Sequence, residues 1–457
     1  VNGCQRIESR LTRLVADAEP EHAGTAAFME GKPPAGQPIP PIEQLIYVDE
    51  QGREVPLPAR LEPGEPVYIQ AEQLWVQRLA TDTIRLSALD KTLHFTFMRQ
   101  GEEEKPFVLT QITDNHGNRQ QFLYGQDNLP YAIVDGNGRV FALQFANIAS
   151  ENYKENHEKH PEQTAGMACQ RLTHIYLLTQ SFSDLDLTLL QETLQKPTAL
   201  STATDTDSQE TAPIGRQLVS YRYNADGDLI EVTDGLGNLV RKFGYRHHLM
   251  ISHEDSAGLI STYEYDHETP NGKVTLNTTN LGERWAFSYF PGYTVVTDAL
   301  GRREEYHFDE HHELVKRISS DGQAMGFERD KLGRVLSQTN EAGQTTYFEY
   351  NRQGQMTKLT RPDNAMLYFM YDNDGHLLGQ TDALGNLTRY RYDDNGKLIE
   401  RVDALNQKSV YAYNDKGLLT SSTDPLGNKT VLAYDENFQL NQVTDCSGNQ
   451  TCFQYNA

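Results

Sequence analysis

The feature that most constrains this fold is a tyrosine that recurs every 21 residues towards the end of the chain. The tyrosines with this spacing are Tyr371, Tyr392, Tyr413, Tyr434 and Tyr455. A fixed period of this length indicates supersecondary units that stack in a row. The chain must therefore be interpreted as a repeat protein.

Each unit also carries two turn sequences at fixed distances from its tyrosine. A glycine follows four residues after the tyrosine, at Gly375, Gly396 and Gly417. A second turn begins eleven residues after the tyrosine with an aspartate and usually contains a glycine; its residues are Asp382, Gly385, Asp403, Asp424 and Gly427. Asp, Asn and Gly tolerate the positive φ angles of tight turns. We therefore assign these positions a structural role in the repeat.

The period is too short for a pair of helices, which needs about 33 residues. It accommodates two strands of about six or seven residues and two turns. Many marker residues have a second aromatic two positions earlier, such as Tyr390 before Tyr392, and this spacing puts both rings on one face of a strand. Leu398 and Leu419 would contact that face from the returning strand, and rings of successive repeats would form cross-strand ladders. The prediction is an all-β array of hairpins.

The array extends well beyond the regular units. From Arg216 onwards its aromatic markers are Tyr223, Tyr245, Tyr265, Tyr289, Phe308, Phe327, Tyr350 and then the regular tyrosines. Pro270 and Pro291 fall where the early spacings are irregular, which suggests bends or insertions within 266–300. A degenerate copy occupies 111–145, where Tyr124 and Phe145 are again 21 apart.

These patterns predict five segments. Residues 1–41 hold a short amphipathic helix within 3–19, based on Ile7, Leu11, Leu14 and Val15, and a Pro-rich connector. Residues 42–110 read as strands that precede the repeats, 111–150 as the first degenerate repeats, 151–214 as an insertion and mobile loop, and 215–457 as the regular array, a part of a larger shell. Within the insertion, Ser183 as N-cap and Pro197 as terminator predict one short helix.

The unit Tyr-x-x-x-Gly-x-Leu-x-x-x-x-Asp-x-x-Gly-Asn, as at Tyr371, Gly375, Leu377, Asp382 and Gly385, resembles the YD repeat of the Rhs family. That repeat also occurs in Tc-toxin C components and teneurins, and residues 42–98 resemble the strand-rich segment that precedes it. The resemblance implies a β-sheet strip that spirals into a shell around a C-terminal toxin. It also implies interbacterial delivery, commonly by type VI secretion.

The resemblance further implies partners and a location. The partners would be the remainder of the shell, its enclosed C-terminal toxin, and a secretion spike protein or chaperone. The protein would reside in the bacterial cytoplasm before secretion and then outside it or in a target cell. The family's self-cleaving core, with repeated Asp-Pro-x-Gly elements, has one counterpart here, Asp424-Pro425-Leu426-Gly427, which falls at an ordinary repeat turn. The chain therefore resembles the N-terminal part of a shell, with neither that core nor the toxin.

Composition narrows the partners further. A formal net charge of -23 and a pI near 5.0 argue against nucleic acid or an anionic membrane as a general partner. No apolar run is long enough to span a bilayer. Four cysteines are too few for a disulfide framework, although Cys446 and Cys452 flank a turn and could face each other. An open sheet of this length has edges that promote association, so we expect the chain to bind the rest of its shell or another copy.

We assign no catalytic, cofactor-binding or metal-binding residue. His157, His160 and His174 are better explained by a solvated insertion than by a metal site, and the pairs His247-His248 and His311-His312 would point to opposite strand faces. Segments 224–228 and 393–396 resemble the start of a calcium loop but recur wherever the repeat needs a turn. No hydrolase, nucleotide or zinc motif is present, so we expect no enzyme. The main alternative to a shell is an adhesion or carbohydrate-binding surface with stacking tyrosines, and a hydrolase is the third.

Overall fold

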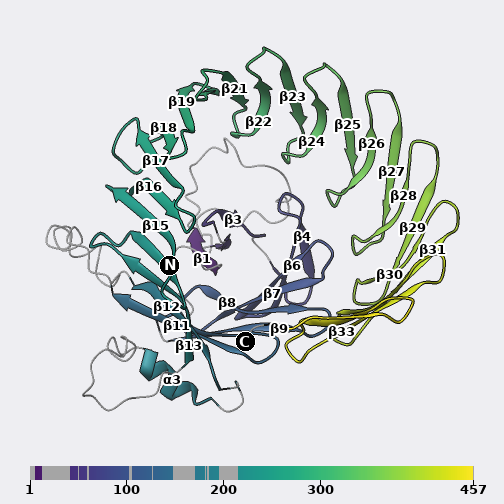
Figure 1. The fold of residues 1–457 in the computed structure, drawn as a ribbon, viewed down its shortest axis with the longest axis horizontal. Coiled ribbons are helices and arrows are strands. Elements are labelled where there is room, and N and C mark those ends of the chain that lie inside the picture. The colour runs from purple at the N-terminus through teal and green to yellow at the C-terminus, as the bar shows by residue number, and fades with distance from the viewer. Residues whose placement is uncertain are drawn as a thin grey trace, which may run out of the picture. The chain divides into compact units, whose positions relative to one another are not determined.

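The structure is a computed structural model that describes residues 6–12, 42–49, 51–58, 61–101, 105–125, 127–147, 170–180, 182, 185–194 and 215–455. Its contacts divide the chain into one unit of residues 2–113 and a second of residues 114–457. Apart from one short helix, the long regular elements of the described chain are all β-strands (Figure 1). The all-β prediction is confirmed.

The first unit is a set of antiparallel strands around an apolar core. β1 pairs with β2 and β8, β2 pairs with β3, and β4 to β7 pair in sequence. Val76, Ile84, Phe97 and Phe107 are fully buried between them. The strands are β1 (Arg6–Thr12), β2 (Ile42–Val48), β3 (Glu54–Pro56), β4 (Pro66–Ile69), β5 (Leu74–Ala80), β6 (Thr83–Ala88), β7 (Leu93–Arg99) and β8 (Phe107–Asp114), the last of which ends in the second unit.

The helix predicted within residues 3–19 is wrong in the part that the structure describes. Residues Arg6–Thr12 form strand β1 and pair along their whole length with β2, from Arg6 opposite Val48 to Thr12 opposite Ile42. Apolar residues at 7 and 11 fit a period of two as well as a helical period. Because the backbone of residues 6–12 can form a ladder of hydrogen bonds with β2, the strand is favoured over the helix.

The second unit is one continuous antiparallel meander. Each strand from β9 to β35 pairs with the next strand in sequence. Consequently every turn after an even-numbered strand lies at one edge of the strip, and every turn after an odd-numbered strand lies at the other.

The strands of the second unit are β9 (Arg119–Tyr124), β10 (Pro130–Val134), β11 (Val140–Asn147), β12 (Gln170–Leu178), β13 (Gly215–Tyr223), β14 (Leu229–Asp234), β15 (Leu239–Arg246), β16 (Leu249–Asp255), β17 (Ile260–Tyr265), β18 (Val274–Thr279), β19 (Arg284–Phe290), β20 (Tyr293–Thr297), β21 (Arg303–Phe308), β22 (Leu314–Ile318), β23 (Ala324–Arg329), β24 (Val335–Thr339), β25 (Thr345–Tyr350), β26 (Met356–Thr360), β27 (Met366–Tyr371), β28 (Leu377–Thr381), β29 (Leu387–Tyr392), β30 (Leu398–Val402), β31 (Lys408–Tyr413), β32 (Leu419–Thr423), β33 (Lys429–Tyr434), β34 (Leu440–Thr444) and β35 (Gln450–Cys452).

A short helix, α3 (Leu187–Leu194), covers the start of this meander. Its Leu190 and Leu194 are buried in a cluster with residues of β10, β11 and β12. The N-cap is Asp186, whose carboxylate accepts hydrogen bonds from the backbone N–H groups of Thr188 and Leu189, so the prediction of Ser183 as N-cap is wrong. The predicted terminator, Pro197, lies outside the described residues. No helix in the described part of the chain is long and apolar enough to cross a membrane.

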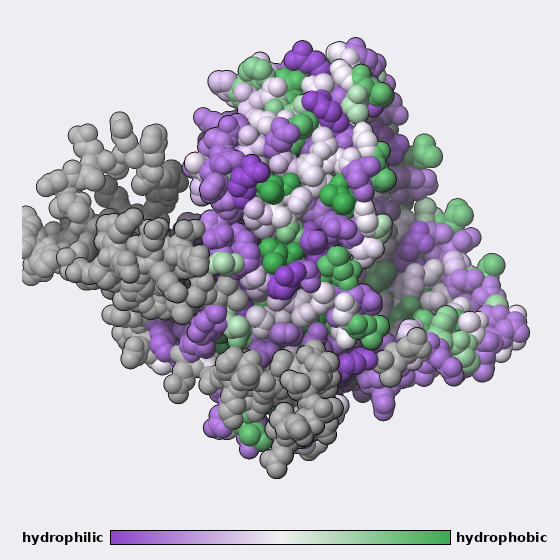
Figure 2. All heavy atoms as spheres, turned by 60° about the vertical axis from the view of Figure 1, so that its left-hand side comes forward, coloured by the Kyte–Doolittle hydropathy of each residue, from purple (hydrophilic) through white to green (hydrophobic). Residues whose placement is uncertain are grey.

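Residues 215–455 form a sheet of one layer. In β29, β31 and β33 half-buried and exposed residues alternate, with the aromatic face half-buried and the opposite face exposed. Of the apolar side chains in this range, only Leu249 and Val295 are buried. Figure 2 accordingly shows apolar and polar residues interspersed over the visible surface. Each strand is therefore held mainly by its neighbours in the ladder.

The strip also curves, and its strands from β13 to β33 follow an arc (Figure 1). Two hydrogen bonds show how far the curvature carries it. The amide of Asn115 donates to the carbonyl of Asn395 at 3.3 Å, and the amide of Asn118 donates to the carbonyl of Lys416 at 2.9 Å. The strip therefore returns to its own first turn after about 280 residues.

Candidate functional site

The candidate functional site is the repeat unit itself, and its tyrosine has a defined structural task. The ladder between β30 and β31 extends only from the pair Val402 and Lys408 to the pair Glu400 and Val410. Beyond the ladder, the hydroxyl of Tyr413 donates to the carbonyl of Leu398 at 2.9 Å. The tyrosine thus bridges the open end of each strand pair. The same bond, to the carbonyl 15 residues earlier, is made by Tyr265, Tyr289, Tyr350, Tyr371, Tyr392, Tyr434 and Tyr455.

Burial keeps these hydroxyls in the form that donates. It raises the pKa of Tyr371, Tyr392 and Tyr413 above the ordinary value of 10.0. A half-buried ring with an engaged hydroxyl is a poor platform for stacking on sugars. The marker tyrosines are therefore parts of the scaffold, which weakens the carbohydrate-binding alternative.

The predicted ring ladders are wrong, although the predicted leucine partners are confirmed. Tyr392 lies opposite Leu398, and Tyr413 lies opposite Leu419. Successive marker tyrosines occupy every second strand, so their strands are about 9.6 Å apart, beyond the reach of ring stacking. Successive repeats are linked by the tyrosine hydroxyl instead.

Four of the regular markers, Tyr371, Tyr392, Tyr413 and Tyr434, coincide with a break in strand register. Between Ala412 and Tyr413, for example, the pairing of β31 with β32 shifts by one residue, as in a β-bulge. A bulge increases the local bend and twist of a strand. In β23 this break falls at Arg329 and not at the predicted marker Phe327. With Arg329 as marker, the spacings from Phe308 and to Tyr350 both become 21, a regularity that a search for aromatic residues misses.

The turns are held by the side chain of their first residue. The carboxylate of Asp382 accepts hydrogen bonds from the backbone N–H groups of Leu384 and Asn386, and also from the side-chain amide of Asn386. Asp403 and Asp424 accept the two backbone bonds in the same way. The turn that contains Asp424-Pro425 is thus built like its neighbours.

The fourth residue of each regular aspartate or asparagine turn in the later repeats has a positive φ, as the turn sequences predict. The angle is 93° at Gly375, 84° at Gly385, 80° at Gly396, 75° at Gly417 and 86° at Gly427. Where glycine is absent, another residue takes this conformation, notably Asn406 at 59° and Phe438 at 63°. The conformation is therefore a requirement of the turn, since residues with a side chain adopt it at a cost.

Hydrogen bonds in the turns also lower carboxylate pKa values. The amide of Asn386 is the main cause of the lowered pKa of Asp382, and Asn428 has the same effect on Asp424. A carboxylate engaged in this way is a stable anion and a poor proton donor. These aspartates have the properties of turn residues and not of catalytic acids.

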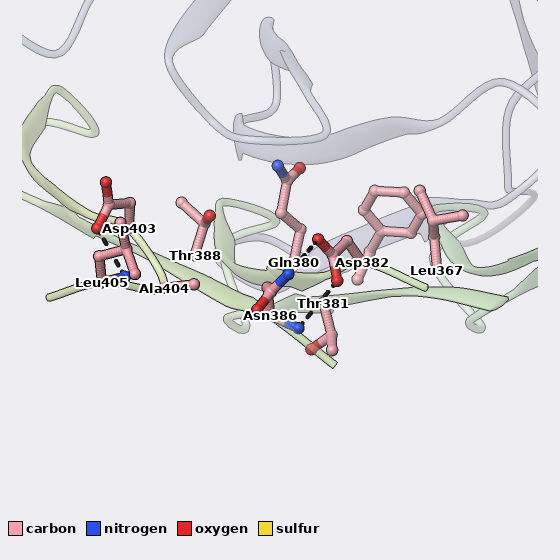
Figure 3. A pocket seen from close by; sticks show the side chains of 10 residues that line it. Leu367, Gln380, Thr381, Asp382, Asn386, Thr388, Asp403, Ala404 and Leu405 are labelled. Atoms are coloured by element: carbon pink, nitrogen blue, oxygen red, sulfur yellow. Dashed lines mark hydrogen bonds between the residues drawn. The ribbon is translucent and has the colours of Figure 1, made fainter. Parts of the chain in front are cut away.

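An open pocket of about 460 Å³ lies on the aromatic face, between consecutive repeats. Figure 3 shows the side chains that line it. Its polar lining comes from Gln380, Thr388 and the turn residues Asp382, Asn386 and Asp403. Both carboxylates in it already accept the local N–H bonds of their own turns. What the pocket offers is a shallow groove with one aromatic side chain, Phe369, in its lining, and no activated nucleophile or acid.

The histidines that the structure describes do not assemble a metal site. His247 and His248 have φ angles of 51° and 65° and form the turn between β15 and β16, so the prediction that they point to opposite faces of a strand is wrong. His311 and His312 likewise lie in the turn that begins at Asp309. A tight turn of positive φ replaces the strand geometry that the prediction assumed. His174 stacks on Tyr176 at 5.7 Å within β12, and His157 and His160 lie outside the described residues.

The calcium-like segments are ordinary turns. Asn224 accepts the N–H groups of residues 226 and 228, and Asp393 accepts those of residues 395 and 397. In the part of the chain that the structure describes, no three metal-ligating side chains cluster. Cys446 and Cys452 are both exposed free thiols, and Cys446 lies in the turn after β34.

Comparison with known proteins agrees with this geometry. The family described as RHS Repeat matches residues 329–365, 371–408 and 413–450. The toxin protein Tse5 of Pseudomonas aeruginosa is 26% identical over 317 residues, which is 65% of this chain and 22% of that protein. The double-stranded DNA deaminase toxin A of Burkholderia cenocepacia is 36% identical over 96 residues, 21% of this chain and 7% of its own length.

Two further similarities are shorter or more distant. The probable deoxyribonuclease RhsB of Dickeya dadantii is 30% identical over 123 residues, 26% of this chain and 8% of that protein. The crystal structure of the TcdB2-TccC3-Cdc42 complex is 12% identical, with 88% of this chain and 23% of that chain covered and a TM-score of 0.36. The chain spans less than a quarter of the length of each of these curated relatives.

A one-layer array of hairpins, bridged by tyrosine hydroxyls and closed by aspartate turns, defines this chain as a β-repeat protein. The later repeats match the RHS repeat, and the toxin protein Tse5 is similar over 65% of the chain. The chain carries the RHS repeat and is similar to proteins of the Rhs/YD-repeat family.

Proposed function

We propose that this chain forms part of the shell of an Rhs-type toxin, and that the shell encloses a toxic polypeptide until delivery. The relatives that support this proposal are described as toxins or as a deoxyribonuclease. The observation that carries it is the return of the strip to its own start, at the hydrogen bond between Asn118 and Lys416. A strip that meets itself bounds a volume, whereas an open adhesion surface has no need to do so.

A shell of this kind works by exclusion. A continuous ladder of strands keeps proteases and other macromolecules away from the enclosed segment. Since the turn carboxylates of the array are engaged in local hydrogen bonds, the array itself contributes no catalytic group, and the toxic activity belongs to the enclosed segment. The half-buried aromatic face, with grooves such as the one in Figure 3, offers apolar contact without a closed core.

The delivery route and partners follow from the same proposal. The protein resides in the bacterial cytoplasm, is exported to rival cells by type VI secretion, and engages a spike protein or a chaperone on the way. Its other partners are the rest of the shell and the toxin. Loss of killing in a competition assay when the type VI apparatus is disabled would support this route, and unchanged killing would exclude it.

Limited proteolysis tests the enclosure. The native gene product that carries this array is digested, and any toxic segment that survives is compared with the same segment expressed alone. Enclosure predicts that the segment in the native product survives at protease concentrations that degrade the free segment completely. Equal digestion rates would refute the proposal. A variant with an opened strip, such as Asn118→Asp with Lys416→Glu, is the matched control and should lose protection.

A further inference from the structure

Six leucines at the tips of turns are unusually exposed. Their side chains are 77% to 88% exposed, and the residues are Leu236, Leu281, Leu300, Leu384, Leu405 and Leu426. Each is the third residue of a turn that follows an even-numbered strand, so all six lie along the same edge of the strip. We call this the leucine edge.

The turns do not need these leucines. In the turn at Asp382, the first residue accepts the backbone N–H groups of Leu384 and Asn386, and the leucine side chain takes no part. Turns with the same hydrogen bonds carry Ala342 or Ser447 at the third position. The exposed leucine is locally dispensable, yet it recurs in three consecutive repeats at Leu384, Leu405 and Leu426, and so forms a row of apolar tips along one edge.

The opposite edge has a different chemistry. Its turns follow odd-numbered strands. They contain the glycines that lie four residues after a marker tyrosine, such as Gly375, Gly396 and Gly417. Their third residues are polar at Asp374, Asn395, Lys416 and Asn437, and Leu332 is the exception. We call this the glycine edge. The two edges of the strip are therefore distinct surfaces.

One contact already joins an even-numbered turn to the glycine edge. The first turn of the second unit, Asp114–Asn118, follows β8, and His116 occupies the position that leucine holds elsewhere. Its ring lies against Gly417 so closely that a Cβ there would come within 2.9 Å of it. Asn118 and Asn115 donate to the carbonyls of Lys416 and Asn395 on the same edge. His116 is half-buried as a result, in contrast to the exposed leucines.

We propose that the leucine edge binds the glycine edge of another YD-repeat strip, in the geometry that His116 shows at Gly417. Glycine leaves the space into which the third residue of the opposing turn inserts, and the carbonyls beside it accept hydrogen bonds from that turn. A leucine fills the place of the histidine ring with apolar contact. This contact between the two edges requires no enclosed cargo, so it can be tested independently of the proposed shell function.

The test uses the whole chain, with a second labelled copy as the probe strip. Sedimentation velocity should show association that strengthens with concentration up to about 0.1 mM. The variant L384S/L405S/L426S should weaken association at least about tenfold with an unchanged melting temperature, since these side chains are exposed in the single chain. The matched control is V410S/V431S, which removes two exposed apolar side chains from a strand face and should leave association unchanged.

A photo-crosslinker in place of Leu405 locates the contact. Crosslinks from one copy to glycine-edge turns of the other, such as 351–355 or 372–376, would support the proposal. Crosslinks to strand faces or to a second leucine edge would overturn it. So would a chain that remains monomeric over the whole concentration range, or association that is insensitive to the leucine substitutions.

Discussion

Replacement of Tyr413 by phenylalanine isolates the contribution of the tyrosine hydroxyl. The substitution keeps the ring opposite Leu419 and removes only the bond to the carbonyl of Leu398. That carbonyl lies beyond the end of the ladder between β30 and β31, so no strand bond replaces the lost donor. A hydrogen bond to a half-buried carbonyl contributes about 1 kcal/mol, and we expect Y413F to destabilise its repeat by this amount.

The effect should accumulate over repeats because each tyrosine serves a different carbonyl. Tyr392 and Tyr434 donate to the carbonyls of Leu377 and Leu419. If the three sites act independently, Y392F/Y413F/Y434F should destabilise the array by about 3 kcal/mol. In a repeat array the stability of each unit depends mainly on its neighbours. The lost free energy should therefore appear first as local unfolding of the substituted repeats, before the whole array unfolds.

Hydrogen exchange and urea unfolding together measure this effect. Amide exchange in β30 and β31 should accelerate by about fivefold in Y413F, which corresponds to about 1 kcal/mol of local opening energy. The matched control is Y347F, since Tyr347 is 54% exposed on the opposite face of the same array and its hydroxyl makes no hydrogen bond within the described residues. Equal exchange rates in Y413F and Y347F would refute the bridging role of the hydroxyl.

Three further predictions concern turns and titration. Gly385→Ala should destabilise the array by about 1 to 2 kcal/mol in urea unfolding, since φ is 84° at this position and the space around it is open. The control is Gly326→Ala, in a strand, where a Cβ would make only an ordinary contact at 3.9 Å; it should be neutral or stabilising. Equal losses of stability in the two variants would contradict the turn argument. Stability should fall in acid, because the folded pKa of Asp382 and Asp424 lies below the ordinary 3.8, so their contribution is present above that value and lost as pH falls through the lower folded one; an unchanged acid midpoint in D382N/D424N would count against it. In alkali, burial raises the pKa of Tyr176 to about 12, so the contribution of this tyrosine to stability should be complete below pH 10 and be lost towards pH 12. An unfolding free energy that does not fall between pH 10 and 12 would be the contrary result.

The hairpin array could be predicted because one short period carries both of its requirements. Tyr392 and Gly396 mark where a strand ends and where the backbone needs a positive φ, and Asp403 marks the next turn. These are local demands on single residues, and they are met in the same way in every copy. The face that carries Tyr390 and Tyr392 follows from the period of two along a strand.

What could not be predicted depends on partners distant in sequence. Residues 6–12 become a strand because β2 is available beside them, which a local helical pattern cannot anticipate. Arg329 holds a marker position without an aromatic ring, because the register break belongs to the position and not to the side chain. The contact of His116 with Gly417 joins residues about 300 apart, so no motif search would bring them together.

The hydrogen bonds of Asn115 and Asn118 in the first turn also relate the number of repeats to the circumference of the coiled strip. Asn115 and Asn118 reach turns centred on residues 395 and 416, which lie one 21-residue repeat apart, so adding or removing one whole unit of the strip brings an equivalent turn to the same joint. Each duplicated or deleted unit changes the perimeter by two strand spacings, about 9.6 Å, and hence the radius of the coil by about 1.5 Å. Any other change in length would exchange the two faces or misalign the joint. The internal capacity of such a coil thus changes in discrete steps, one for each repeat that is added or removed.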